Sequence, residues 1–171
     1  GDVCWEDING DGIINTLDRK VVGNERPSVT GGWSTTLTYK NLSLYARFDY
    51  ALGHTIYNDL KARSMGQYQG QFNLITKVKE MWSENNPDAK YPVFTYADQL
   101  DKHNIWRGNS IFYEKASYMA LREITLSYSL PKQWIRTLQM SNANVYVTGQ
   151  NLFYLTSYDG ASPEPTNGVD Y

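Results

Sequence analysis

The sequence predicts an all-β fold of long antiparallel strands, and three features point to it. Four long segments alternate polar and apolar residues with a period of two, as expected of strands that present two different faces. A two-residue turn joins the first two segments, as in a β-hairpin. Aromatic residues are frequent, with 14 Tyr, 5 Trp and 5 Phe, and such side chains suit pleated surfaces and interfaces.

The first two strands form a hairpin that we predict over residues 29–57. In "VTGGWSTTLTYKN", Trp33 and Leu37 lie on one face and threonine or serine residues on the other. Lys40 and Asn41 supply the tight turn, and "LSLYARFDYALG" continues the alternation in the opposite direction.

Two further strands are predicted within residues 112–156. In "SYMALREITLSYSLP", strict alternation places Ala120 and Arg122 on one face and Met119 and Leu121 on the other. A short linker leads into "ANVYVTGQNLFYLTSY", where valines alternate with polar residues and tyrosine.

The remaining segments are predicted loops: residues 1–28, 58–111 and 157–171. Within the longest of them, "LITKVKEMWSEN" spaces its apolar residues at helical intervals and predicts one short helix, based on Leu74, Val78, Met81 and Trp82. Asp98 and Asp101 in the same loop are interpreted as a solvated face. A loop of this length next to a sheet usually has a function of its own.

The strand pattern fits two architectures. Long antiparallel strands, with short turns at one end and long loops at the other, are typical of an outer-membrane β-barrel. A soluble β-sandwich shows the same alternation, because its apolar faces are buried between two sheets. Even the smallest barrels have about eight strands, so in the barrel interpretation this chain supplies part of the wall.

The stretch "DINGDGIINTLD" predicts a cation-binding loop. An EF-hand loop places side-chain oxygens at positions 1, 3, 5, 9 and 12, a backbone carbonyl at 7 and glycine at 6. The chain fills the ligand positions with Asp7, Asn9, Asp11, Asn15, Asp18 and the carbonyl of Ile13. Gly12 stands at the turn position, and the side chain of Ile13 is expected to point inward. The oxygen ligands favour a structural Ca²⁺ ion.

Two qualifications apply to this loop. Asp18 stands where the EF-hand has glutamate, and the shorter carboxylate predicts weaker binding or a site that also accepts Mg²⁺. No helical segment precedes the loop, so we describe it as EF-hand-like. The alternative is a turn rich in Asn, Asp and Gly whose side chains bond their own backbone.

The sequence offers little for catalysis or nucleic-acid binding. No nucleophile elbow, phosphate-binding loop or H-E-x-x-H motif occurs, so we predict that the chain is not an enzyme. His54 and His103 stand alone and are assigned surface or packing roles, and Cys4 lacks basic neighbours that would activate it. The formal net charge is −2 and the basic residues are scattered, which excludes a nucleic-acid platform.

Five stretches follow one another along nearly the whole chain: "GDVCWEDINGDGIINTLDRKVVGN", "YALGHTIYND", "MWSENNPDAKYP", "SYMALREITLSYSLPKQW" and "NVYVTGQNLFYLTSYDGASPE". Together they resemble the C-terminal part of the SusC/RagA family of TonB-dependent outer-membrane transporters of Bacteroidetes. The last two stretches are the most specific.

The resemblance implies a fold, a location and partners. It implies a 22-stranded transmembrane barrel in the outer membrane of a Gram-negative cell, in contact with its lipid. A SusD-like surface lipoprotein would cover the mouth, and glycan oligomers or peptides would be imported with energy supplied through TonB. The TonB contact would belong to an N-terminal part, and one more strand is expected after Tyr171.

The resemblance also orients the predicted strands. The turn at 40–41 and the linker 131–142 would be periplasmic, and the three loops extracellular. The residues expected to face lipid are Trp33, Leu37, Phe48, Ile124, Leu126 and Val147. Those expected to face the lumen are Arg47, Asp49, Glu123 and Gln150. Arg122 shares the lipid-facing side of its strand, so we expect it near the membrane interface or in a bulge.

The sequence leaves a second function open. A free-standing, soluble, calcium-binding β-sandwich that recognises carbohydrate or protein would also account for the cation loop and the abundance of tyrosine.

Overall fold

The computed structural model describes residues 1–67, 73–96, 98, 100, 102–105, 108–137 and 139–165. Asp101 and residues 166–171, which the predictions include, lie outside this described part. The chain divides into two compact units. The loop unit contains Gly1–Asn24, Thr55–Glu114 and Asp159–Ser162, and the sheet unit contains Glu25–His54, Lys115–Tyr158 and Pro163–Tyr171.

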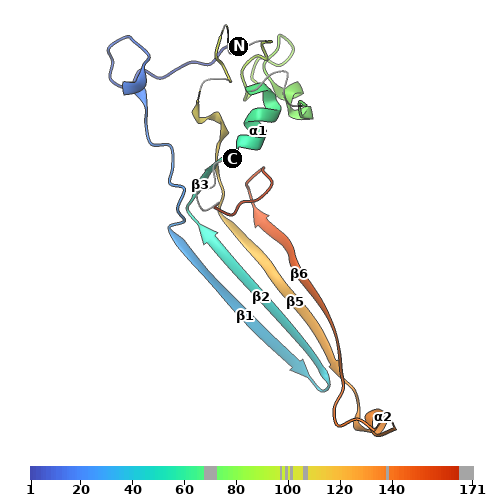
Figure 1. The fold of residues 1–171 in the computed structure, drawn as a ribbon. Helices are drawn as coiled ribbons and strands as arrows, with labels where there is room; N and C mark the ends of the chain where they lie inside the picture. The colour runs from blue at the N-terminus through green and yellow to red at the C-terminus, as the bar shows by residue number, and fades with distance from the viewer. Residues whose placement is uncertain are drawn as a thin grey trace. The chain divides into compact units, whose positions relative to one another are not determined.

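The sheet unit is built on four antiparallel strands in the order β1-β2-β5-β6 (Figure 1). These are β1 (Val29–Tyr39), β2 (Leu42–Leu52), β5 (Tyr118–Ser129) and β6 (Asn144–Thr156). All four predicted long strands are therefore confirmed.

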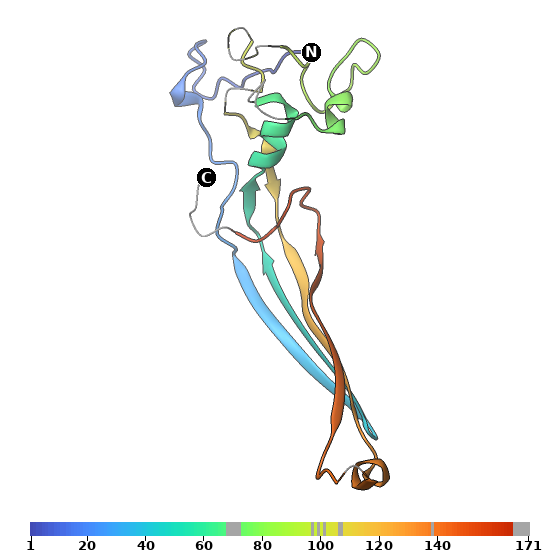
Figure 2. The same cartoon turned by 45° about the vertical axis from the view of Figure 1, so that its right-hand side comes forward.

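Short connections join the strands at one end of the sheet. Tyr39 pairs with Leu42, so Lys40 and Asn41 form the two-residue turn as predicted. Lys40 has a φ of 54°, the left-handed conformation that such tight turns require. The link between β5 and β6 contains a short helix that the sequence did not predict, α2 (Lys132–Thr137), and Figure 2 shows it beyond the ends of both strands.

The register gives the sheet an apolar face and a polar face. Residues directly opposite one another in antiparallel strands share a face. The apolar face contains Val29, Trp33, Leu37, Tyr39, Leu42, Leu44, Ala46, Phe48, Tyr50, Leu52, Met119, Leu121, Ile124, Leu126, Tyr128, Val145, Val147, Phe153 and Leu155. The polar face contains Ser34, Thr36, Ser43, Tyr45, Arg47, Asp49, Glu123, Thr125, Ser127, Tyr146, Thr148 and Gln150.

A β-bulge at Arg122 corrects the strict alternation predicted for β5. Arg47 pairs with Glu123 while Phe48 pairs with Leu121, so Arg122 is the extra residue between them. A bulge reverses the alternation beyond it. Met119 and Leu121 therefore join the apolar face, and Ala120 lies on the polar one, where it was not expected. We expected Arg122 near the membrane interface or in a bulge, and the structure shows the bulge.

The loop unit contains short elements. Strands β3 (Thr55–Tyr57) and β4 (Tyr113–Lys115) form a two-stranded sheet. Helix α1 (Asp59–Ala62) follows β3, and a π-helical turn, Arg63–Gln67, continues it. Three 3₁₀ turns complete the unit: Thr16–Asp18, Thr76–Glu80 and Ser110–Phe112. No helix among the described residues has the length and apolar character needed to cross a membrane.

The helix predicted from Leu74 to Trp82 is shorter and of a different type. Only Thr76–Glu80 is helical, as a 3₁₀ turn, and Met81 already has extended backbone angles. The Trp82 amide donates a hydrogen bond to the Tyr91 carbonyl at 3.0 Å instead of continuing the helix. The helical spacing of Val78 and Met81 reflects packing into the core of this unit, not a complete α-helix, and Leu74 is exposed.

The core of the loop unit buries one aspartate, Asp98, together with apolar residues. Its buried apolar residues are Ala62, Met65, Met81, Tyr91, Ile105 and Phe112. Asp98, predicted to be solvated, is 3% exposed. Its carboxylate accepts backbone hydrogen bonds from Asn104 and Ile105, both at 2.9 Å. The prediction of a solvated face was wrong for Asp98, because a buried carboxylate is tolerated where backbone donors satisfy it.

Candidate functional site

Three features are candidates for function: the opening loop, a cavity beside it in the loop unit, and a cluster of charged side chains on the polar face of the sheet.

The opening loop, residues 7–18, turns around its first carboxylate. Asp7 accepts backbone hydrogen bonds from Gly10 at 2.7 Å and Gly12 at 2.8 Å. Gly12 has a φ of +76°, a left-handed conformation that glycine adopts without strain, as the sharp turn predicted at this position requires.

The other predicted ligands continue the same pattern. The Asp11 carboxylate accepts the backbone N–H of Ile13 at 2.7 Å. The two oxygens of Asp18 accept the backbone N–H groups of Asn15 at 2.7 Å and Ile8 at 3.0 Å. The hydrogen bond from the Asn15 backbone, with smaller ones from Ile8 and Asn9, lowers the pKa of Asp18 from its usual value. This carboxylate is therefore charged at neutral pH, as a cation ligand must be.

The donor set suits a hard cation, but its present arrangement is that of a hydrogen-bonded turn. The Ile13 carbonyl accepts a hydrogen bond from the Asn15 side-chain amide at 3.1 Å. The Ile13 side chain, expected to point inward, is 65% exposed. Among the described residues, no group of three or more His, Cys, Asp or Glu side chains is placed to hold a metal ion. Carboxylate oxygens keep further lone pairs, so Ca²⁺ binding here stays a prediction.

The cavity next to this loop has a volume of about 980 Å³. Asn15 and Asp18 line it, so the predicted cation loop forms part of its wall. Its aromatic lining consists of Trp5, Tyr57, Trp82, Tyr91 and Tyr113. Rings with polar tips, mixed with charged residues, can contact a ligand that has both apolar and hydrogen-bonding surfaces.

A buried lysine, Lys61, joins three segments of the loop unit. The Lys61 side chain is 6% exposed, and its Nζ donates to Glu114 at 2.7 Å and Asp159 at 3.3 Å. Lys77 also pairs with Asp159. Burial lowers the pKa of Lys61, but the hydrogen bonds to Glu114 and Tyr91 outweigh it, so the pKa lies above its usual value. Lys61 therefore carries a structural positive charge at neutral pH.

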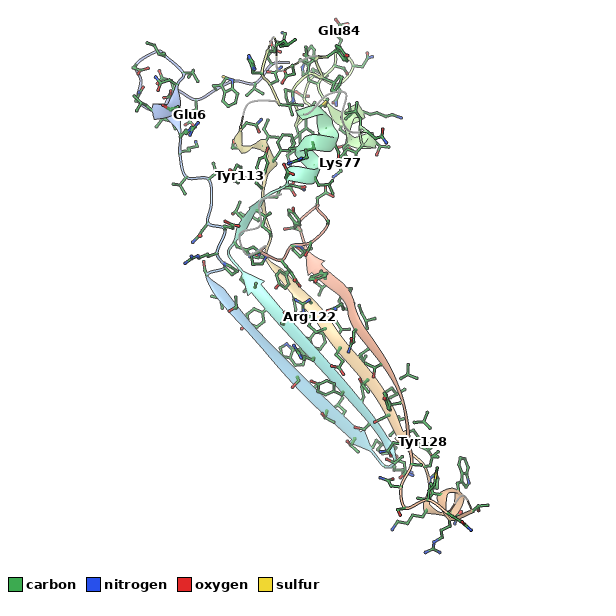
Figure 3. All side chains as sticks on the ribbon, in the orientation of Figure 1. Glu6, Lys77, Glu84, Tyr113, Arg122 and Tyr128 are labelled. Carbon is green, nitrogen blue, oxygen red and sulfur yellow. The ribbon has the colours of Figure 1, made fainter. Side chains whose placement is uncertain are left out.

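The charged cluster on the polar face is centred on Arg122, in the middle of the sheet (Figure 3). Its Nε donates to Asp49 Oδ1 at 2.5 Å and its Nη2 to Asp49 Oδ2 at 2.8 Å, a bidentate pair. Nη1 donates to Asn151 at 3.3 Å and to the Tyr154 hydroxyl at 3.0 Å. Nη2 also bonds Glu164. We call Asp49, Arg122, Asn151, Tyr154 and Glu164 the Arg122 cluster.

The segment after β6 is attached to this cluster. The Tyr154 hydroxyl donates to Glu164 at 2.6 Å, and the Pro163 carbonyl accepts a hydrogen bond from His54 Nε2 at 2.8 Å. The hydrogen bond from Tyr154, followed by that from Arg122, lowers the pKa of Glu164. His54 is 1% exposed, which confirms a packing role. Sequence spacing did not reveal this cluster, because its members are far apart in the sequence and a bulge brings Arg122 to them.

The comparisons with known proteins agree with this architecture. No protein-family model matches the chain. The chain is 32% identical to TonB-dependent receptor P26 of Formosa agariphila, over 98% of this chain and 16% of that protein. It is 25% identical to TonB-dependent receptor SusC of Bacteroides thetaiotaomicron, over 96% of this chain and 15% of that protein. The structure of the RagAB peptide transporter matches 85% of this chain and 15% of its own, with 28% identity and a TM-score of 0.67.

The chain is a segment of a SusC/RagA-like TonB-dependent receptor. It spans about 16% of the length of the first of these relatives. TonB-dependent receptors are outer-membrane proteins and transporters, so the prediction that the segment is not an enzyme agrees with its family. The antiparallel strands of the receptor segment match those of a TonB-dependent barrel fragment, as the family resemblance implied.

Proposed function

We propose that the receptor segment forms part of the wall of an outer-membrane barrel that imports nutrients. The observation that carries this proposal is the apolar face, which is continuous over four strands and widely exposed. Trp33 is 50% exposed, Leu37 62% and Val147 73%. An exposed apolar face of this extent is unfavourable in water, but it matches the lipid-facing side of a barrel wall.

The edges of the sheet support the same conclusion. In the described sheet, β1 and β6 are the outer strands, of 11 and 13 residues. Unpaired backbone groups cost several kcal/mol each in a bilayer, so membrane strands occur in closed barrels. We infer that further strands of the receptor pair with β1 and β6, within the 22-stranded barrel that the family resemblance implies.

The names of the relatives support a proposal for the substrate and the partners. RagAB is named a peptide importer, and SusC is a TonB-dependent receptor. We infer import of glycan oligomers or peptides, a SusD-like lipoprotein at the mouth, and coupling to TonB through another part of the receptor. The aromatic cavity of the loop unit is suited to contact such a substrate.

The soluble β-sandwich is less well supported. A sandwich buries the apolar face of one sheet under a second sheet. Among the described residues, the second sheet consists only of the three-residue strands β3 and β4. The relatives are also membrane receptors, so the structure and the comparisons both favour the barrel.

A pair of neighbouring substitutions tests the membrane role. Leu37 lies on the apolar face and Thr36 on the polar face of β1. In a receptor that carries this segment, Leu37→Arg is expected to cost about 1 kcal/mol, because Leu37 lies close to the turn at the end of β1, whereas Thr36→Arg should cost less. The measurement is the fraction of folded barrel, from its heat-dependent migration in gels, after outer-membrane insertion.

The two variants carry the same new charge on adjacent residues, so each serves as the control for the other. Equal losses in both would contradict a lipid-facing role of the apolar face.

A further inference from the structure

The Arg122 cluster has a feature that a simple ion pair does not need. A guanidinium group has five N–H donors. Arg122 donates two hydrogen bonds to Asp49 and one each to Asn151, Tyr154 and Glu164. These acceptors come from β2, from β6 and from the segment that follows β6.

Two donors converge on one oxygen of Glu164. Arg122 Nη2 and the Tyr154 hydroxyl both donate to Oε1, the latter at 2.6 Å. A charged N–H and an O–H that meet at one point are suited to a carboxylate oxygen of any origin. The site is partly shielded, because the Arg122 side chain is only 19% exposed.

Within the Arg122 cluster, the balance of charges favours release of the Glu164 contact over loss of Arg122. Asp49 and Glu164 carry two negative charges against the single positive charge of Arg122. When Glu164 leaves, Arg122 keeps its bidentate pair with Asp49, so no unpaired charge remains on the sheet. When Arg122 is lost, two carboxylates remain close together without their cation.

The chain presents Glu164 in a constrained way. Pro163 and Pro165 flank it, and each proline restricts the backbone of the residue before it. Pro163 is buried, and its carbonyl is held by the buried His54. A carboxylate with little conformational freedom binds with a small entropy cost, so it can act as a ligand within its own chain.

We propose that Arg122 and Tyr154 form a carboxylate-binding position on the polar face, which Glu164 occupies from within the chain and which an acidic ligand takes over. Displacement of Glu164 releases residues 163–165 from the sheet. The inference rests on the proposed function, since the polar face of a barrel wall is the side expected to face the lumen. It names the class of ligand to which this face responds: one that carries a carboxylate.

Limited proteolysis, with the cut sites mapped by mass spectrometry, tests the displacement on a purified receptor that carries this segment. The probe is trigalacturonic acid, and the neutral galactotriose is its matched control. Trigalacturonic acid should accelerate cleavage within residues 157–162 about tenfold or more, because a segment released from the sheet is accessible to the protease for a larger fraction of the time. Galactotriose should have no effect.

Two variants sharpen the test. Glu164→Ala, which removes the acceptor oxygens, should show the fast cleavage without ligand and should not respond to the acid. Glu123→Gln, which removes a carboxylate from the same face outside the cluster, should behave as the wild type. Unchanged cleavage in the wild type throughout the titration, or slow cleavage in Glu164→Ala, would overturn the proposal.

The outcome is independent of the membrane test. Cleavage is measured on the purified receptor without TonB or lipoprotein, so a failed displacement leaves the contrast between Leu37→Arg and Thr36→Arg unchanged. If the acid releases the segment while both of those variants lose equal amounts of folded barrel, the proposed function fails and the carboxylate position remains.

Discussion

At the scale of single residues, Arg122 shows how the backbone can place a charge. Its side chain belongs by strict alternation to the apolar face, where arginine is costly. The bulge at Arg122 shifts the register by one residue, so the guanidinium reaches Asp49 on the polar face. The Asn151 backbone on the opposite strand has a φ of 49°, which marks the matching irregularity in β6. One extra residue therefore places the guanidinium among polar partners instead of on the apolar face.

Replacement of Arg122 should destabilise the barrel more than replacement of Glu164. In a receptor that carries this segment, Arg122→Met is expected to cost about 1–3 kcal/mol, because Asp49 and Glu164 lose a charged donor. The midpoint of thermal unfolding in detergent measures the loss. Arg122→Met with Asp49→Asn should recover part of it, and a double variant no more stable than Arg122→Met would contradict the assignment.

The opening loop carries a prediction about metal ions. Calorimetric titration with CaCl₂ should release or absorb heat with the wild type, and this heat should disappear in Asp11→Ala, which removes one of the six predicted ligands. Glu84→Ala is the control, because it removes an exposed carboxylate far from the loop in sequence. No difference in heat between the wild type and Asp11→Ala would leave the loop as a hydrogen-bonded turn.

At the scale of elements, strands were easier to predict than helices. The alternation in β1, β2 and β6 reflects two different environments on either side of one sheet, so it can be read from the sequence alone. The spacing of Val78 and Met81 reflects packing in the loop core, which does not specify an α-helix. Helix α2 was missed because its six residues lack a long periodic pattern.

The segment after β6 should loosen in acid. The pKa of Glu164 is lowered from 4.5, first by the Tyr154 hydroxyl and then by Arg122. The like charge of Asp49 opposes this lowering of the pKa. Tyr118 also faces the Arg122 cluster. A carboxylate with a lowered pKa stabilises the fold above its unfolded pKa, and this contribution is lost as the pH falls through the folded value.

The measurement is the difference in unfolding temperature between the wild type and Glu164→Gln. This difference should be constant at neutral pH and should shrink as the pH falls below about 4.5. The variant provides its own control, since its glutamine does not titrate. A difference that persists unchanged into strong acid would show that Glu164 does not carry the charge that holds the segment.

At the scale of the whole molecule, the described sheet has an exposed apolar face and two free edges, which a bilayer and neighbouring strands would cover in the proposed barrel. Its apolar face is exposed, and β1 and β6 end the described sheet with unpaired edges. The 171-residue chain in buffer without detergent is therefore expected to dimerise, exchange strands or pair its edges. Sedimentation velocity measures this, and a clean monomer at high protein concentration would contradict it. Detergent micelles should reduce association through the apolar face.

The sequence by itself determined the strands, the hairpin turn and the family resemblance, because alternation and local turn chemistry are properties of neighbouring residues. It also identified the six candidate ligands of the opening loop, whose spacing is local. Only the tertiary structure decided which face Leu121 and Arg122 occupy, because a bulge is fixed by pairing with two other strands. It also decided that Glu164 meets Arg122, 42 residues away in sequence, since no local pattern encodes contacts made when the chain folds back on its own sheet.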